Sequence, residues 1–129
     1  MTPETLDMLA WEKQQGLLPA IVQDADSRRV LMLGYMNREA LAQTLRSGRA
    51  TFYSRSKQRL WQKGESSGHT QEVKEIYIDC DADCVLMKVV QNVAACHTGY
   101  RSCFYRKWEQ QMFVIAGKKV FNEEDVYKQ

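Results

Sequence analysis

Residues 79–84, with the sequence DCDADC, concentrate three carboxylates and two thiols, which are side chains that bind metal ions. Side chains alternate between the two faces of a β-strand. If this segment is extended, Asp79, Asp81 and Asp83 share one face and Cys80 points to the other. Carboxylates suit magnesium or manganese, and thiolates suit zinc. The spacing therefore predicts two different metals on two faces of one strand.

Two other interpretations of the aspartates have to be weighed. The D-x-D-x-D pattern also begins an EF-hand loop, but Cys84 stands where that loop needs glycine, and Val90 stands where it needs glutamate. An EF-hand is therefore excluded. A solvated edge strand without a metal stays open, although aspartate is depleted in strands and three of them need a reason to recur there.

The remaining thiols lie in residues 95–103, ACHTGYRSC. Cys96 and Cys103 are seven residues apart, which is not the spacing of a CxxC zinc knuckle, and Cys80 and Cys84 are candidates for further ligands. Four thiolates would form a closed structural zinc site. If Cys84 is only a small core residue, three thiolates leave one position open, as in catalytic zinc sites. His97 next to Cys96 is then a candidate general base, unless it is a packed or surface histidine.

The elements that must position these residues follow from hydrophobic periodicity, helix caps and turn residues. They predict an α+β fold with mostly antiparallel strands, because the connections are of hairpin length and leave little room for crossovers. The helices are expected at residues 4–14 and 37–48, the latter between an Asn37 N-cap and a Gly48 stop, with a last helical turn in 122–129. The strands are expected at residues 17–25 and 29–36, joined by a turn near 24–27, and at 50–56, 71–79 with a register slip at Lys74–Glu75, 84–92 and within 102–117. Residues 61–69 are expected to form a loop.

Composition limits the function classes. The chain has 129 residues, 44% hydrophobic and 26% charged, which is typical of one soluble globular domain spanning residues 1–129. A net charge of +2 gives no strong field toward nucleic acid or a membrane. The apolar runs are too short to span a bilayer, and the N-terminus lacks the pattern of a signal peptide. We therefore expect a cytoplasmic protein, in which four cysteines serve as ligands or catalysts rather than disulfides.

Three segments together resemble one enzyme family. WQKGESSGHTQEV, DCDADC and ACHTGYRSCFYR are similar to the signature segments of phosphoribosyl-AMP cyclohydrolases, and the resemblance runs from about LMLGYMNREAL to SCFYR. It implies a zinc- and magnesium-dependent hydrolase of L-histidine biosynthesis, an intertwined homodimer that adds water to carbon 6 of the adenine ring of N1-(5-phosphoribosyl)-AMP. By position, Cys80, Cys96 and Cys103 match the family's zinc ligands, one zinc per subunit, with Cys80 coming from the opposite subunit. Asp79, Asp81 and Asp83 match its magnesium ligands.

The implied substrate carries two phosphate groups, so basic residues near the motifs become candidates. Arg55, Lys63 and Arg101 are possible anion partners, because guanidinium and ammonium groups bind phosphate well; each is otherwise a solvated surface charge. Trp61 is expected to stack on the purine or to lie in the core. His69, in the same loop, is either a polar contact to substrate or a solvated histidine.

Three other function classes compete with this one. A zinc-stabilised binding module would need Cys84 as a fourth ligand. A zinc nucleobase deaminase would need an H-x-E signature, which neither His69 nor His97 begins. A nucleic-acid-binding zinc protein would need a clustered basic face rather than one short basic run.

The other large side chains that stand out are expected to be structural. Tyr35 and Met36 are expected to pack at a strand end, and Trp108 and Phe113 are expected to lie in the core or at an interface.

Overall fold

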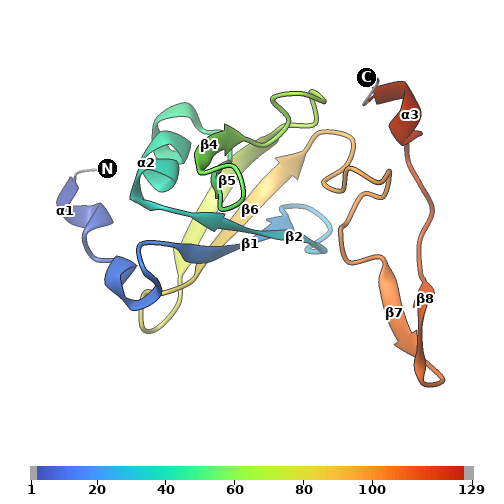
Figure 1. Cartoon of the computed structure of the whole chain (residues 1–129), viewed down its shortest axis with the longest axis horizontal. Helices are drawn as coiled ribbons and strands as arrows, with labels where there is room; N and C mark the ends of the chain where they lie inside the picture. The colour runs from blue at the N-terminus through green and yellow to red at the C-terminus, as the bar shows by residue number, and fades with distance from the viewer. Residues whose placement is uncertain (1–2, 127–129) are drawn as a thin grey trace.

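The computed structural model describes residues 3–126, and a four-stranded sheet in the order β2-β1-β6-β5 is its centre (Figure 1). Two two-stranded sheets, β3-β4 and β7-β8, complete the strands of the described residues. The elements in chain order are α1 (Pro3–Leu6), the 3-10 turn η1 (Trp11–Gln14), β1 (Leu18–Asp24), β2 (Val30–Met36), α2 (Arg38–Ser47), β3 (Thr51–Ser54), β4 (Arg59–Gln62), β5 (Gln71–Ile78), β6 (Val85–Gln91), β7 (Arg106–Glu109), β8 (Met112–Ile115) and α3 (Glu123–Val126).

The predicted α+β fold with mostly antiparallel strands is confirmed. Four strand pairs within residues 3–126 are antiparallel hairpin partners, and β1 with β2 is closed by a turn in which Asp24 Oδ2 accepts from the Ser27 amide at 2.9 Å. The expectation that crossovers have little room is wrong at one place, since β1 and β6 pair in parallel. The elements from β2 to β5 together form the long connection that a parallel pair requires.

Helix α2 has the caps that its sequence predicts. Asn37 Oδ1 accepts from the Ala40 amide at 2.8 Å, and Gly48 adopts a φ of 76° and donates to Thr44 O. Leu41 is buried, and Leu45 is half-buried against the same core. This places one face of the helix on the sheet.

The continuous helix predicted for residues 4–14 is wrong. The chain forms the short helices α1 and η1 with a break between them. At the break, the Ala10 amide donates 2.8 Å to Ala82 O, in the turn between β5 and β6, and so leaves the helical pattern. The Trp11 indole donates to Leu6 O at 2.9 Å and holds the two turns together.

Strand β5 contains the irregularity expected at Lys74–Glu75. Its register against β6 shifts between Val73 and Glu75, so that Lys74 is the unpaired residue of a β-bulge. Because side chains alternate along a strand, one extra residue returns the apolar positions to the core face, where Val73 and Ile76 pack.

The core fills one face of the central sheet. Leu18, Ala20 and Val22 of β1 are fully buried, and Phe52 of β3 packs closely enough on Gly34 that a Cβ there would lie 2.7 Å from its ring. Met36 is fully buried, as its predicted packing role requires. The other large buried side chains of this core are Leu31, Val85, Met87 and Val89.

The opposite face of the sheet carries a row of apolar side chains, and residues 3–126 cover this row only in part. By strand register, Leu33 of β2 lies beside Ile21, Ile21 beside Leu86, and Leu86 beside Tyr77 of β5. The two outer members are 45% and 47% exposed. The row is thus an apolar stripe across all four strands.

The β7-β8 hairpin projects away from the central sheet (Figure 1). Trp108 and Phe113 on it form an edge-to-face pair with ring centroids 5.1 Å apart, and they are 59% and 65% exposed. They are therefore not core residues of this chain, which leaves the interface alternative. The last helical turn expected in residues 122–129 is present as α3, while residues 127–129 lie outside the described part.

Candidate active site and metal-binding residues

Cys96 and Cys103 come together at one end of the sheet. The loop that holds them is closed by backbone hydrogen bonds from Ala95 N to Arg101 O and from Cys96 N to Tyr100 O. The Cys103 amide donates 2.7 Å to Leu31 O, which fixes the second thiol against β2. The sequence separation of seven residues is thus spanned by a compact loop rather than a zinc knuckle.

The two thiols contact each other in a shielded position. Cys96 is buried, and its Sγ lies 2.9 Å from Thr98 Oγ1. Cys103 is exposed as a residue, but burial of its thiol and then the neighbouring Cys96 raise its pKa to about 12. In a metal-free protein this thiol is protonated at neutral pH. Paired cysteine sulfurs are the donors that zinc prefers, so the chemistry of this pair fits part of a zinc site.

Lys63 lies beside the same two thiols. It follows β4 directly, and its Nζ donates to Ala95 O at 2.5 Å. Burial lowers the pKa of Lys63, while Cys103 and Cys96 oppose that shift. The expected role of Lys63 as a phosphate partner stays a prediction, but its ammonium is turned toward the cysteine loop.

A cavity of about 290 Å³ opens next to this loop and is lined by His97 and by residues of 54–67. Trp61 packs on Phe52 of the core, with ring centroids 5.2 Å apart, and it also lines the cavity, while its stacking on a purine stays a prediction. The loop expected at residues 61–69 begins at Lys63, since Trp61 and Gln62 end β4. The chemically active lining residues are Lys57, Arg59, Trp61, Lys63, Glu65 and His97.

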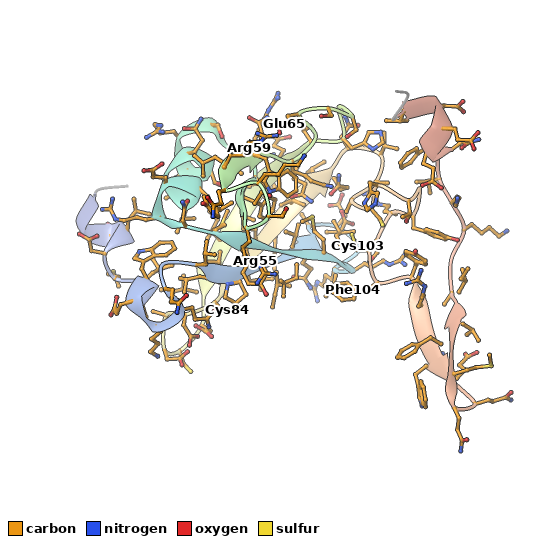
Figure 2. All side chains as sticks on the ribbon, viewed as in Figure 1. Arg55, Arg59, Glu65, Cys84, Cys103 and Phe104 are labelled. Carbon is orange, nitrogen blue, oxygen red and sulfur yellow. The ribbon has the colours of Figure 1, made fainter. Side chains whose placement is uncertain are left out.

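Sequence reasoning missed the ion pair in this cavity. Arg59 Nη2 lies 2.8 Å from Glu65 Oε1, and both side chains are partly exposed (Figure 2). The residue types alone did not predict this ion pair, since an arginine or a glutamate in a polar stretch is usually solvated. The β3-β4 hairpin brings Arg59 to the loop, and this pairing could be inferred only after the hairpin was known.

The two histidines have different environments. His97 is exposed and lines the cavity directly after Cys96. His69 is buried, with its ring edge-on to Phe121 at a centroid distance of 4.8 Å. Burial, and then Lys63, lower the pKa of His69, and its Nδ1 has no hydrogen-bond partner within residues 3–126. His97, not His69, therefore faces the solvent-accessible space.

Arg101 and Arg55 have protein partners. Arg101 donates to Val93 O at 2.8 Å and lies 3.4 Å from Asp24 Oδ1, so it braces the cysteine loop against the sheet. Arg55 stacks on the Tyr35 ring, with its guanidinium carbon 4.0 Å from the centroid. Binding of substrate by either arginine stays a prediction.

The DCDADC segment is a turn between β5 and β6, and the expected extended strand is wrong. Asp79 Oδ1 accepts from the amides of Asp83 and Cys84 at 2.9 and 3.1 Å, which closes the turn, and Ala82 adopts a φ of 60°. Aspartate side chains favour turns for this reason, because they hydrogen-bond to backbone amides a few residues on.

The turn nevertheless gathers the three carboxylates. One oxygen from each of Asp79, Asp81 and Asp83 lies within 4.8 Å of the others. A hydrogen bond between Asp81 and Asp83 lowers the pKa of Asp81 and raises that of Asp83. Lys13 Nζ lies 3.4 Å from Asp81 Oδ2 and 3.8 Å from Asp83 Oδ2, so a cation already stands at this cluster. A cluster of carboxylates that attracts a cation fits a magnesium site.

The acidic turn and the thiol pair lie at opposite ends of the central sheet, since the turn comes just before β6 begins at Val85, whereas Cys103 is hydrogen-bonded to Leu31 near the β1-β2 turn. Figure 2 labels Cys84, at the acidic turn, and Cys103, at the cysteine loop, far from each other. Cys80 lies in the acidic turn between β5 and β6, so within one chain it is separated from Cys96 and Cys103 by the length of the sheet. The Cys84 thiol is half-buried, and burial raises its pKa. One chain therefore cannot gather four thiolates, and the acidic cluster is the only group of three candidate ligands within residues 3–126.

These features define an enzyme rather than a purely structural module, because thiols, an ammonium group and a histidine meet beside an open cavity. The family model of phosphoribosyl-AMP cyclohydrolase matches residues 32–105, which is more than half of the chain. This chain belongs to the phosphoribosyl-AMP cyclohydrolase family. No helix among residues 3–126 is long and apolar enough to cross a membrane.

Three curated relatives illustrate the similarity. The phosphoribosyl-AMP cyclohydrolase of Methanosarcina barkeri is 54% identical over 123 residues, covering 95% of this chain and 93% of that protein. The protein of the same name from Methanosarcina acetivorans is 57% identical over 122 residues, covering 95% and 98%. That of Geotalea uraniireducens is 51% identical over 121 residues, covering 93% and 97%.

Proposed function

We propose that this enzyme opens the adenine ring of N1-(5-phosphoribosyl)-AMP by adding water at carbon 6. The product is the phosphoribosyl-formimino-aminoimidazole carboxamide ribonucleotide, and the reaction is the third step of L-histidine biosynthesis. The observation that carries the proposal is the contact between the Cys96 and Cys103 thiols, with His97, the residue after Cys96, lining the adjoining cavity, in a chain whose relatives are named for this activity.

Zinc would be held by Cys96 and Cys103 together with Cys80 of the partner subunit. The donor chemistry fits, since the first two thiols already contact each other. A bound zinc ion would supply a Lewis acid that polarises water at the cavity. Four thiolates of a single chain cannot form a closed structural site, because Cys80 and Cys84 lie in the β5-β6 turn, away from Cys96 and Cys103.

His97 would act as the general base. It is exposed, lines the cavity and adjoins a zinc ligand, so it can take a proton from the attacking water. The water oxygen bonds to carbon 6, the bond between nitrogen 1 and carbon 6 breaks, and a proton ends on nitrogen 1. Trp61, which lines the cavity, would stack on the purine, and Lys57 and Arg59 on the same wall carry charges that suit the phosphates.

Magnesium would bind at Asp79, Asp81 and Asp83. The fit rests on the three carboxylate oxygens within 4.8 Å and on the Lys13 ammonium that stands in for a cation there. Its role would be to neutralise substrate phosphate. Because zinc would need Cys80 from a second chain, the magnesium site of one subunit would lie beside the zinc site of the other.

A homodimer would complete the active site and cover the exposed apolar surface. The row of Leu33, Ile21, Leu86 and Tyr77 and the aromatic pair on the β7-β8 hairpin are the apolar surfaces available for it. Apolar patches of this kind are typical of protein interfaces.

The proposal is tested by following the ultraviolet change of ring opening with purified protein and N1-(5-phosphoribosyl)-AMP. We expect turnover by the unaltered enzyme and its loss in a Cys96→Ser variant that keeps the same thermal unfolding midpoint. Absence of turnover in folded, metal-loaded, unaltered protein would contradict the proposal. A zinc-stabilised binding module would then be the better account.

A further inference from the structure

Lys63 is fixed at both its backbone and its ammonium group. Its amide donates to Ala50 O at 3.0 Å, directly after the pairing of β4 with β3. Its Nζ donates at 2.5 Å to Ala95 O, the carbonyl that precedes Cys96 in the chain. The side chain therefore spans from the β3-β4 hairpin to the cysteine loop and holds a positive charge at a defined place.

The ionisable groups that neighbour this ammonium are the two thiols, which become negatively charged thiolates when they bind a metal ion. Cys103 and Cys96 are its electrostatic partners, and Lys63 is half-buried among them. No salt bridge joins Lys63 to a carboxylate in the described part of the chain, whereas Arg59 on the same cavity wall is paired with Glu65. The Trp61 ring centroid is 5.7 Å from Nζ, which is at the outer limit of a cation–π contact.

Charge counting explains why a cation belongs there. A divalent zinc ion with three thiolates carries a net charge of about −1. A shielded anionic centre is costly unless it is paired, and the attraction between opposite charges is stronger where water is partly excluded. The Lys63 ammonium is the cation that the fold holds beside two of the three thiolates.

We propose that Lys63 is a positioning residue that supplies the counter-charge of the zinc centre and fixes Cys96 through Ala95 O, rather than a ligand of substrate phosphate. This inference rests on the proposed function, because it assumes zinc at Cys96 and Cys103. Phosphate binding is assigned instead to cationic side chains that do not contact the cysteine loop, such as Lys57, which lines the same cavity.

The direct test is the zinc affinity of Lys63→Met, measured at one fixed pH by competition with a chromophoric chelator. We expect zinc to bind roughly tenfold more weakly or worse than to the unaltered protein, since one close charge is removed. Lys63→Arg should recover part of the affinity, because it restores the charge. The matched control is Lys57→Met, which removes a cavity cation away from the thiols and should leave zinc affinity unchanged.

Kinetics of the zinc-saturated variant separate the two roles. A counter-charge predicts a lower kcat with nearly unchanged KM for Lys63→Met, whereas a phosphate ligand predicts a raised KM with unchanged zinc affinity. Thermal unfolding of both variants checks that the fold is intact. Equal zinc affinity in Lys63→Met and the unaltered protein would overturn the inference alone. Failure of the unaltered protein to bind zinc at all would overturn the zinc site of the proposed function and the inference together.

Discussion

The Lys13 ammonium lies 3.4 Å from Asp81 Oδ2, although the two residues are 68 positions apart in the chain. The contact forms because η1 packs on the β5-β6 turn, where Ala10 N donates to Ala82 O. Lys13 thereby occupies the mouth of the carboxylate cluster that we propose for magnesium.

Removing this lysine should strengthen binding of divalent ions. In Lys13→Met the ion no longer competes with an ammonium group, and the three carboxylates keep their full charge. We expect Mn²⁺ or Mg²⁺ affinity to rise by roughly two- to tenfold at low ionic strength, measured by isothermal titration calorimetry. Lys74→Met is the control, since Lys74 pairs with Glu72 on β5 instead. Weaker binding in Lys13→Met would contradict a cation site at these aspartates.

Removing the proposed base should slow the chemical step while the metals stay bound. For His97→Ala we expect kcat to fall by about 10²- to 10⁴-fold, the usual contribution of a positioned general base. Metal content by mass spectrometry and KM should change little, because His97 is not among the proposed ligands. Near-normal turnover with both metals in place would remove His97 from the mechanism.

A substitution at Gly34 tests how tightly the core is packed around Phe52. A Cβ at this position would lie 2.7 Å from Phe52 Cδ1, and Phe52 is fully buried. Gly34→Ala should therefore lower the free energy of unfolding by about 1–3 kcal/mol, measured by urea denaturation. Gly117→Ala is the control, because its Cβ would make an ordinary contact of 3.8 Å with Tyr100. Equal stability of the two variants would show that Phe52 can move.

The shared zinc site predicts complementation between two inactive variants. Cys80→Ser and Cys103→Ser should each be inactive alone. In a mixed dimer, one site combines intact Cys96 and Cys103 with Cys80 of the partner subunit. An equal mixture that exchanges subunits should regain about a quarter of the original activity, because half of the dimers are mixed and each has one intact site. No recovery, despite mixed dimers detected by native mass spectrometry, would contradict a site built from two subunits.

Local features of the fold could be predicted because their causes lie within a few residues. The caps of α2 at Asn37 and Gly48 and the bulge at Lys74 depend on side-chain type and on a periodicity that returns to register. The strand expected for DCDADC failed for an equally local reason. The Asp79 side chain hydrogen-bonds to the amides of Asp83 and Cys84 and turns the chain.

Contacts between distant segments could not be read from the sequence. The Lys13–Asp81 pair depends on where η1 packs, and the Lys63–Ala95 hydrogen bond depends on the β3-β4 hairpin meeting the cysteine loop. The residues flanking Lys13 and Lys63 in the sequence do not indicate these contacts, since lysines are common on every protein surface. The separation of Cys80 from Cys103 likewise follows from the length of the central sheet rather than from spacing along the chain.

The most direct test of the account is metal dependence of ring opening. Metal-stripped protein would be assayed with N1-(5-phosphoribosyl)-AMP by its ultraviolet change, with zinc and magnesium added back separately and together. We predict substantial turnover only when both metals are present. Full turnover of the metal-stripped protein, or no turnover under any metal condition in folded protein, would contradict the account.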